Sequence, residues 1–333
     1  MSVDPQLDLF GAAPTQRTPP GVESCADTPD TLALAARLPA GLRLGTSSWS
    51  FPGWRGLIYG RDGDPSRLSR QGLAAYASHP WLRTAGIDST FYALPQAARL
   101  AEYASQVPAD FRFLIKAPAR LTDPLTRGPG GRPLGENPDF LDAATAATQV
   151  VAPILEGLGE RLGVLLLQFP PTGPRVCESP RRFAEDLYRF LRRLPCGPTY
   201  AVELRDAALL TPDLVQALRH GGAQPALAVH PRLPGLDEQA RLHRERLPGP
   251  LVIRWVLRPN RGYEEARSRY QPFDHLVEPD PVQRRAIAEL VMPTLETGHD
   301  VYVIANNKAE GCAPASLLAL AETLVSGPLD GRA

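Results

Sequence analysis

Eight short apolar segments recur along the chain, and most are followed by a polar loop and then by residues at helical spacing. Several are apolar at nearly every position, as in the Val-Leu-Leu-Leu that follows Gly163, which is typical of strands covered on both faces. Alternating strands and helices indicate right-handed crossovers and a parallel sheet. Eight such units predict a closed (β/α)8 barrel of the TIM type, with an open doubly wound sheet as the alternative. The segments are 42–47, 85–92, 111–117, 164–169, 200–204, 225–229, 251–256 and 301–305.

Helical segments are expected between these strands. The segment 180–194 begins with a proline, which is favoured in the first turn of a helix, and carries apolar residues at helical spacing. Similar patterns predict helices over 138–158, 281–295 and 314–324, and a short leading helix over 31–38.

The chain of 333 residues divides into one folded domain and two tails. Residues 1–30 are rich in Pro, Gly, Thr and Asp, a composition that predicts a disordered N-terminal tail. Residues 31–326 are expected to form a single barrel domain, and 327–333 a short C-terminal tail. The formal net charge is +0, which excludes a global field that attracts nucleic acid or membranes. Any anion binding must therefore come from a local patch.

The cellular address is expected to be the cytoplasm. The first ten residues lack the basic start and apolar core of a secretory signal, and no run is long and apolar enough to span a bilayer, so no membrane partner is expected. The four cysteines are scattered and form no CxxC pair, which argues against a zinc ribbon or a thioredoxin-type site. We expect reduced thiols in a reducing compartment.

Every predicted strand ends in polar residues. Barrels collect their catalytic and binding groups at the carboxyl ends of the strands, so a shared site is expected there. For any single residue, a structural hydrogen-bond partner is the alternative. The candidate binding residues are Thr46, Ser47, Trp49, Ser89, Tyr92, Gln168, Arg205, Arg254, Asn306 and Asn307, and the candidate catalytic residues are Asp88, Lys116, Glu203 and His230.

The cations among these residues predict an anionic small molecule as ligand. Arginine offers a planar fork that matches phosphate or carboxylate, and lysine acts as a point charge. Glu203 and Arg205 lie two apart on one strand and so share a face. The two residues either form a structural ion pair, or Glu203 is a general base or acid held by the neighbouring cations. His230 could take the same role as Glu203.

No metal and no cofactor are expected. Asp88, Glu203 and His230 are the plausible metal ligands, and the adjacent cations disfavour a divalent ion. The chain contains no Walker loop and no GxSxG elbow. The glycine-rich stretch 128–135 has no dinucleotide-binding spacing.

Two long connections, 118–139 and 258–280, lie on the strand-exit side, and long loops of this kind are often functional. The second interleaves arginine and tyrosine, a composition that suits single-stranded nucleic acid. The alternative is a solvated loop whose arginines pair with Glu264 and Glu265.

The residues at the strand ends resemble those of the YecE-like family, the domain of unknown function 72, over residues 42–324. The resemblance rests on Gly45-Thr-Ser-Ser-Trp49 with Trp54, Asp88-Ser-Thr-Phe-Tyr92, Phe113-Leu-Ile-Lys-Ala-Pro118, Gln168-Phe-Pro-Pro171, Glu203-Leu-Arg205, and Asn306-Asn307 with Ala313-Pro314. It implies a barrel fold and a site, but no reaction.

The chain departs from the family pattern at several positions. Gly86 stands where the family usually has a glutamate, Asp88 where asparagine is usual, and Ser48 where glycine is common. His230 occupies a frequent aspartate position, and Val256 and Leu257 follow Arg254 where histidine and glycine are often found. Chemistry that depends on the missing glutamate or histidine is not expected here.

The N-terminal tail contains a short peptide, Gln6-Leu7-Asp8-Leu9-Phe10, that resembles the motif by which bacterial replication and repair proteins dock on the DNA polymerase sliding clamp. Leu9 and Phe10 would enter an apolar pocket and Gln6 would form a hydrogen bond beside it. The alternative is that Leu7, Leu9 and Phe10 fold back onto the barrel.

Two functions from different classes follow from these observations. The first is an enzyme that acts on a phosphorylated or other anionic substrate, which could be nucleic acid. Its expected class is a metal-independent hydrolase or lyase, and the tail would bring it to DNA. The second is a non-catalytic barrel that binds an anion or a partner protein. Replacing Glu203 or His230 distinguishes the two, because only an enzyme loses turnover while binding is retained.

Overall fold

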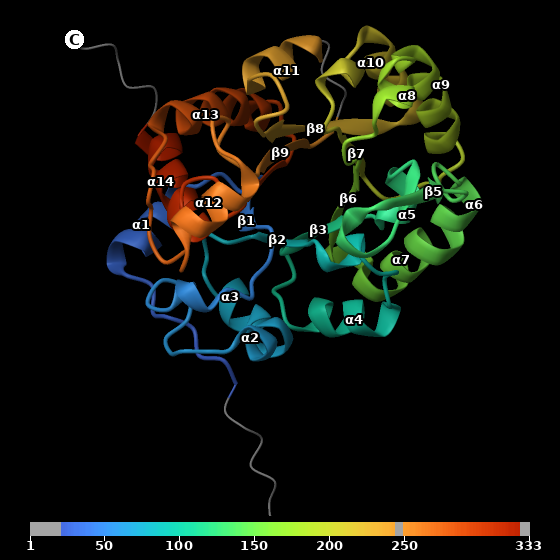
Figure 1. The fold of residues 1–333 in the computed structure, drawn as a ribbon. Coiled ribbons are helices and arrows are strands. Elements are labelled where there is room, and N and C mark those ends of the chain that lie inside the picture. Colours follow the sequence, from blue (N-terminus) through green and yellow to red (C-terminus); the bar gives the residue numbers. More distant parts are fainter. Residues whose placement is uncertain (1–20, 244–248, 327–333) are drawn as a thin grey trace, which may run out of the picture.

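The structure is a computed structural model, and it describes residues 21–243 and 249–326. Eight parallel strands close into a barrel in the order β1-β10-β9-β8-β7-β6-β3-β2 (Figure 1). The predicted (β/α)8 fold is therefore confirmed, and the open-sheet alternative is wrong. The strands are β1 (Leu42–Thr46), β2 (Thr84–Ile87), β3 (Arg112–Lys116), β6 (Leu162–Gln168), β7 (Tyr200–Glu203), β8 (Ala223–Val229), β9 (Leu251–Trp255) and β10 (Val301–Ala305).

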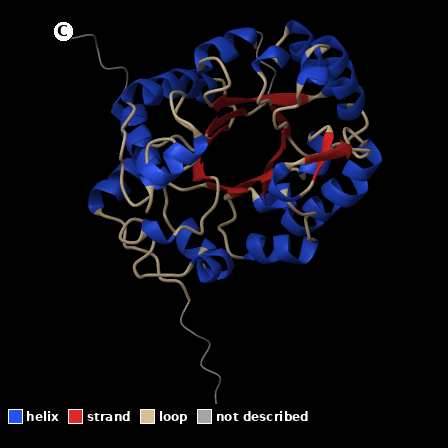
Figure 2. Cartoon of the chain, in the orientation of Figure 1, coloured by secondary structure: helices blue, strands red, loops and turns tan. Residues whose placement is uncertain are grey.

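Helices form a ring outside the strands (Figure 2). They are α1 (Pro29–Arg37), α2 (Pro65–Gln71), α3 (Leu73–Ala77), α4 (Ala97–Ser105), α5 (Ala119–Thr122), α6 (Ala143–Thr145), α7 (Ala152–Leu158), α8 (Pro174–Cys177), α9 (Pro180–Leu191), α10 (Pro212–Gly221), α11 (Leu236–Leu242), α12 (Tyr263–Tyr270), α13 (Pro281–Glu296) and α14 (Ala313–Ser326). Short 3-10 turns, η1 (Pro52–Trp54), η2 (Ser89–Phe91), η3 (Pro129–Gly131), η5 (Gly159–Arg161) and η6 (Ala207–Leu209), complete the connections.

Two expected elements have different bounds in the structure. The helix expected from residue 138 begins at α6, where the side chain of Asp142 caps the N–H of Thr145, and it runs through the π-helical turn η4 (Ala146–Val151) into α7. The second expected strand ends at Ile87, because Asp88 takes a helical conformation and opens the turn η2.

The barrel interior is filled by one inward-facing set of side chains. They are Leu114, Val164, Leu166, Ala201, Ala226, Val252, Tyr302 and Ile304. Side chains alternate along a strand, so the next inward positions after Leu114, Ala201 and Val252 are Lys116, Glu203 and Arg254. The apolar interior therefore gives way to charge at the carboxyl ends of the strands.

Residues 21–28 lie against the barrel, ahead of α1. The Cys25 N–H donates to the Ile58 carbonyl at 2.8 Å, and the ring of His79 contacts Asp27 at 2.9 Å and Ser24 at 3.2 Å. The folded part of the chain thus starts nearer the N-terminus than the expected boundary at residue 31. The clamp-like peptide at 6–10 and the C-terminal residues 327–333 lie outside the described residues.

The two long connections are both structured. The first contains α5 and a hairpin of β4 (Leu125–Arg127) and β5 (Pro133–Glu136). The second contains α12, and arginines in and just before this helix pair with acids. Arg261 and Arg269 contact Glu278 at 2.7 Å and 2.8 Å, and Arg261 contacts Glu265 at 2.6 Å. The arginines of this connection therefore pair with acids, as expected for the alternative of a solvated loop. The acid with most of these contacts is Glu278 and not Glu264.

Within the described part of the chain, no helix combines the length and the apolar character needed to cross a membrane.

Candidate active site

Five charged side chains from four strand ends, those of β2, β3, β7 and β9, meet at the barrel mouth: Asp88, Lys116, Glu203, Arg205 and Arg254. Oδ2 of Asp88 lies 3.4 Å from Lys116 Nζ and 3.3 Å from Arg254 Nη2. Nε of Arg254 lies 3.4 Å from Oε2 of Glu203, and Nη2 of Arg205 contacts the other carboxylate oxygen, Oε1. The structure thus joins all five residues in one network, and we call it the mouth cluster.

The mouth cluster is almost fully buried, with its opening at Asp88. Glu203 is 0% exposed and Arg254 2%, whereas the Asp88 side chain is 28% exposed. Lys116 and Arg205 are also buried. A molecule that arrives from solvent therefore meets Asp88 first, with Lys116 directly beside it.

Several polar atoms of the mouth cluster have no hydrogen-bond partner among the described residues. They are Asp88 Oδ1, both carboxylate oxygens of Glu203, Arg205 Nη1, and Nε and Nη1 of Arg254. The Glu203–arginine contacts are short enough for ion pairs, but their geometry does not align donor and acceptor. Buried polar groups in proteins are normally satisfied, so these free donors and acceptors mark a place for a ligand or ordered water.

The charges of the mouth cluster do not cancel. Three cations face two carboxylates, which leaves one positive charge when all five groups are ionised. Burial acts to raise the pKa of Asp88, but the charges and hydrogen bonds of Arg254 and Lys116 outweigh it and hold that pKa below its usual value. Burial, aided by the two arginines, lowers the pKa of Lys116 despite the opposing carboxylates.

His230 lies beside the mouth cluster but is a poor general base at neutral pH. Its Nδ1 accepts a hydrogen bond from the N–H of Arg232 at 3.2 Å. Burial, together with the charges of Arg205 and Arg232, lowers its pKa to about 4. The ring is therefore neutral at pH 7 and carries its proton on Nε2, which makes it a hydrogen-bond donor.

Three more of the candidate residues flank the mouth cluster. Ser47 and Gln168 are buried, and by strand alternation they and Asn306 face the barrel axis. The Ser47 hydroxyl donates to the Ala305 carbonyl at 3.3 Å, and Asn306 Oδ1 accepts from the N–H of Lys308 at 3.1 Å.

Three other candidates face away from the barrel axis and hold the loops to the helices. The N–H of Thr46 donates to the Tyr76 hydroxyl at 3.0 Å, and Trp49 Nε1 donates to the Ser69 carbonyl at 3.3 Å. Asn307 Oδ1 accepts from Trp54 Nε1 at 3.2 Å. The structure does not bring these side chains into the mouth cluster. They either point to the outer face of the barrel, because side chains alternate along a strand, or lie beyond the end of the strand.

The remaining two candidates, Ser89 at the start of the turn η2 and Tyr92 directly after it, are exposed, with Tyr92 87% exposed. A neighbour that sequence reasoning missed is closer to the charges, since the ring centre of Phe91 lies 4.9 Å from Lys116 Nζ. Lys308 was also missed: its Nζ lies 4.3 Å from the ring centre of Tyr263 and 3.4 Å from Asn306 Oδ1. Its place two residues after Asn306 was the available signal.

Gly86 faces the barrel axis at the point where β1 and β2 approach most closely. A Cβ on Gly86 would lie 3.0 Å from the Cα of Ser47, and a Cβ on Gly45 would lie 2.0 Å from the Thr84 carbonyl oxygen. The close strand contact therefore leaves little room for a side chain at position 86.

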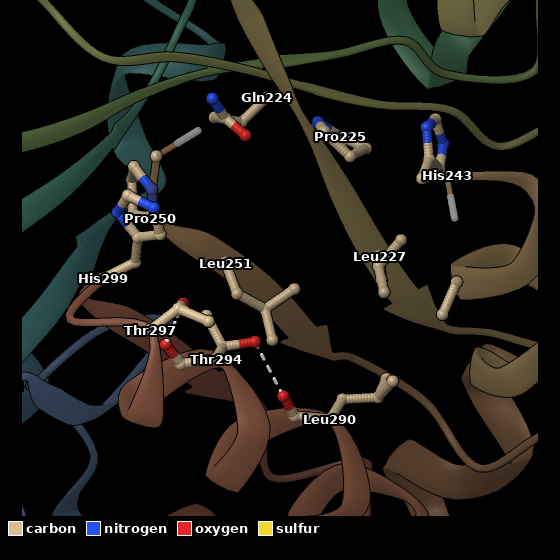
Figure 3. A pocket seen from close by; sticks show the side chains of 12 residues that line it. Gln224, Pro225, Leu227, His243, Pro250, Leu251, Leu290, Thr294, Thr297 and His299 are labelled. Carbon is tan, nitrogen blue, oxygen red and sulfur yellow. Dashed lines mark hydrogen bonds between the residues drawn. The ribbon is translucent and has the colours of Figure 1, made fainter. Parts of the chain in front are cut away.

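A separate cavity of about 270 Å³ lies outside the barrel, between β8, β9, α11 and α13 (Figure 3). Its described lining is mainly apolar, with Leu227, Leu251 and Leu290, and it contains no carboxylate, lysine or arginine. It adjoins the first residues of β9, far from the strand ends that carry the mouth cluster. We place the candidate site at the mouth cluster, because charged groups with unsatisfied donors and acceptors converge there.

No three His, Cys, Asp or Glu side chains within residues 21–243 and 249–326 are grouped so that they could hold a metal ion.

Comparisons with known proteins agree on the fold. A family model described as "Protein of unknown function DUF72" matches residues 43–330. A DUF72 family protein from Enterococcus faecalis has 19% sequence identity and a TM-score of 0.54, covering 85% of this chain and 97% of that one. A DUF72 family protein from Thermotoga maritima also has 19% identity, with a TM-score of 0.53 over 86% of this chain and 98% of that one.

A methyltransferase from Methanosarcina mazei has 10% identity and a TM-score of 0.44 over 87% of this chain and 98% of that one, a likeness too low to support an argument. No curated protein matches this chain.

Proposed function

This chain belongs to the DUF72 family, and we propose that its barrel mouth is the active site of an enzyme acting on a small anionic substrate. The observation that carries the proposal is the set of unpaired donors on Arg205 and Arg254 inside a network with one excess positive charge. A phosphate or carboxylate group would satisfy these donors and neutralise that charge.

The residues of the mouth cluster take different roles in this proposal. Arg205 and Arg254 bind the anionic group. Asp88 is the carboxylate nearest to solvent and lies beside Lys116, so it is placed to exchange protons with the substrate. Glu203 is fully buried between two arginines and acts as their counter-charge. These roles need no metal ion, and a hydrolase or lyase is the reaction class they fit.

The alternative is a barrel that binds an anion without changing it. The pairing of every charge in the mouth cluster with an opposite charge would suit a static binding site equally well. Turnover separates the two, because a binding protein has none.

Calorimetric titration with inorganic phosphate tests the binding step. We expect Arg205→Met to weaken phosphate binding at least tenfold, since it removes a buried donor. Asp88→Asn should leave phosphate binding equal or tighter, because it removes a negative charge. Arg175→Met, on an 89% exposed side chain that pairs with Glu136 and is no member of the mouth cluster, is the matched control and should bind like the wild type.

A screen of the wild type against phosphorylated and carboxylated metabolites, and against single-stranded DNA and RNA, then identifies the reaction. Loss of turnover in Asp88→Asn with phosphate binding retained would support an enzyme. Unchanged phosphate binding in Arg205→Met would refute the assignment of the mouth as the anion site.

The tail adds a proposed link to DNA metabolism. The peptide Gln6-Leu7-Asp8-Leu9-Phe10 has the pattern of a sliding-clamp ligand, and the residues that follow it would act as a tether for the barrel. Recruitment to DNA would make nucleic acid or one of its breakdown products the first substrate class to examine.

A further inference from the structure

Lysine is almost absent from this chain. Of the 36 basic residues, 34 are arginine, and the two lysines are Lys116 and Lys308. Both are buried at the barrel mouth: Lys116 is the last residue of β3, and Lys308 follows the end of β10. Arginine fills every other basic position, so this chain has lysine only at the mouth, where its chemistry can differ from that of arginine.

The property that distinguishes the two side chains is the ability to become a neutral amine. We propose that Lys116 is a nucleophile that forms a Schiff base with the carbonyl carbon of an anionic aldehyde or ketone. This proposal rests on the proposed function, because the anionic group of the same substrate would lie against Arg205 and Arg254.

The two lysines have different surroundings. Lys116 Nζ lies 3.4 Å from the Asp88 carboxylate, which can accept its proton, and 4.9 Å from the ring centre of Phe91. Lys308 Nζ lies near the rings of Tyr263 and Phe273 and 3.4 Å from the amide oxygen of Asn306, and none of these groups is a base that could take its proton. Lys116 is therefore the lysine placed for proton loss and attack.

The charge of the mouth cluster favours the same lysine. Arginine keeps its proton at any physiological pH, so Lys116 is the one cation of the cluster that can lose it. Burial and the charges of Arg254 and Arg205 lower the pKa of Lys116, although Asp88 and Glu203 oppose them.

The step balances without any other reactant. Asp88 takes a proton from the ammonium of Lys116, and the free amine attacks the carbonyl carbon while the C=O electron pair moves to oxygen. A proton of the attacking nitrogen then passes to the oxygen, which gives a neutral carbinolamine. The nitrogen lone pair forms C=N, and the hydroxyl leaves as water with the proton that Asp88 returns. The ammonium and the carbonyl compound become a protonated imine and one water, with no change in charge or oxidation state.

The experiment uses reductive trapping on the full-length protein. The protein is incubated with cyanoborohydride and either glyoxylate or glycolaldehyde phosphate, which join an aldehyde to an anionic group, or acetaldehyde, which is uncharged. Peptide mass mapping then locates the adduct. We expect Lys116 to be modified at least tenfold faster than Lys308 by the two anionic probes, and this preference to be lost with acetaldehyde.

Two variants complete the test. Lys116→Arg keeps the charge and should abolish the fast adduct, whereas Lys308→Arg should leave it unchanged. Equal labelling of both lysines, or labelling of the N-terminal amine alone, would overturn the proposal. The peptide map of the wild type is sufficient for this test, even if a variant does not fold. Phosphate titration of the same protein separates the two levels: binding without an adduct refutes the Schiff base alone, and absence of both refutes the anion site as well.

Discussion

The Nε of Arg254 lies 3.4 Å from Oε2 of Glu203 inside the barrel, with both side chains withdrawn from solvent. Glu203 contacts Arg205 on its other oxygen, and Arg254 reaches Asp88 with a second nitrogen. The carboxylate of Glu203 thus compensates the charges of Arg205 and Arg254, and the guanidinium of Arg254 compensates those of Glu203 and Asp88. The stability of the barrel mouth depends on keeping all of these charges together.

Removing Glu203 should therefore be costly. Glu203→Ala leaves two arginines without their buried counter-charge, and breaking a buried pair in this way costs about 3–5 kcal/mol. The measurement is the free energy of unfolding in urea. The matched control is Glu185→Ala on α9, where a 49% exposed carboxylate pairs with Arg181, and there the loss should be about 0–1 kcal/mol. Similar losses for the two variants would contradict the role assigned to Glu203.

His243 should make the protein sensitive to acid. Burial lowers the pKa of His243 to about 4, below the value of 6.5 expected in the unfolded chain. Between these two values the unfolded state binds more protons, so stability rises with pH over this window and is lost as the pH falls from 6.5 towards 4. His243→Gln cannot be protonated and should flatten this dependence by roughly 1–3 kcal/mol between pH 6.5 and 4.

Thermal unfolding at several pH values measures this effect. His275→Gln is the control, because His275 is 68% exposed, and it should keep the wild-type slope. His230, whose pKa is also lowered to about 4, should account for a second part of the slope. A wild-type slope in His243→Gln would show that the ring does not stay neutral in the folded protein.

Glu278 should hold α12 in place over the β9 exit. It contacts Arg261 at 2.7 Å and Arg269 at 2.8 Å, and accepts a hydrogen bond from the Tyr270 hydroxyl at 2.6 Å. Hydrogen bonds from Arg261, opposed by burial and reinforced by Tyr270, lower the pKa of Glu278 to about 2. Glu278→Gln should speed amide hydrogen exchange across α12 by about tenfold, since each charge-assisted contact contributes on the order of 1 kcal/mol or more.

The control for α12 is Glu264→Gln, because Glu264 is 77% exposed and contacts Arg267 at 3.7 Å. Exchange in α12 should then remain at the wild-type rate. Unchanged exchange in Glu278→Gln would mean that packing of Ala266 and Tyr270, rather than the ion pairs, fixes this helix.

The N-terminal peptide should bind the DNA polymerase sliding clamp. Leu9 and Phe10 would carry most of the affinity, since burying a large apolar side chain contributes roughly 1.5–3 kcal/mol. Replacing both with alanine should weaken binding about a hundredfold or more, measured by titration of purified clamp. A chain lacking residues 1–30 should not bind, and equal binding by all three proteins would rule out the tail as the ligand.

Local patterns predicted the architecture well because each barrel unit is encoded by neighbouring residues. The apolar run of β6 and the proline at the start of α9 are both visible in the printed sequence. The five members of the mouth cluster were likewise all named from their positions at strand ends. Lys308 and Phe91 were missed, because their closeness to the site depends on how turns beyond the strands bend.

The sequence by itself determined that eight strands alternate with helices and that polar groups end those strands, because strand and helix periodicity are local properties of the chain. Only the tertiary structure decided which groups meet. Asp88 and Arg254, 166 residues apart, share an ion pair, while Thr46 and Asn307, beside inward-facing positions, turn away from the axis. The physical reason is that barrel closure sets the register between distant strands, and a shift of one residue sends a side chain to the opposite face.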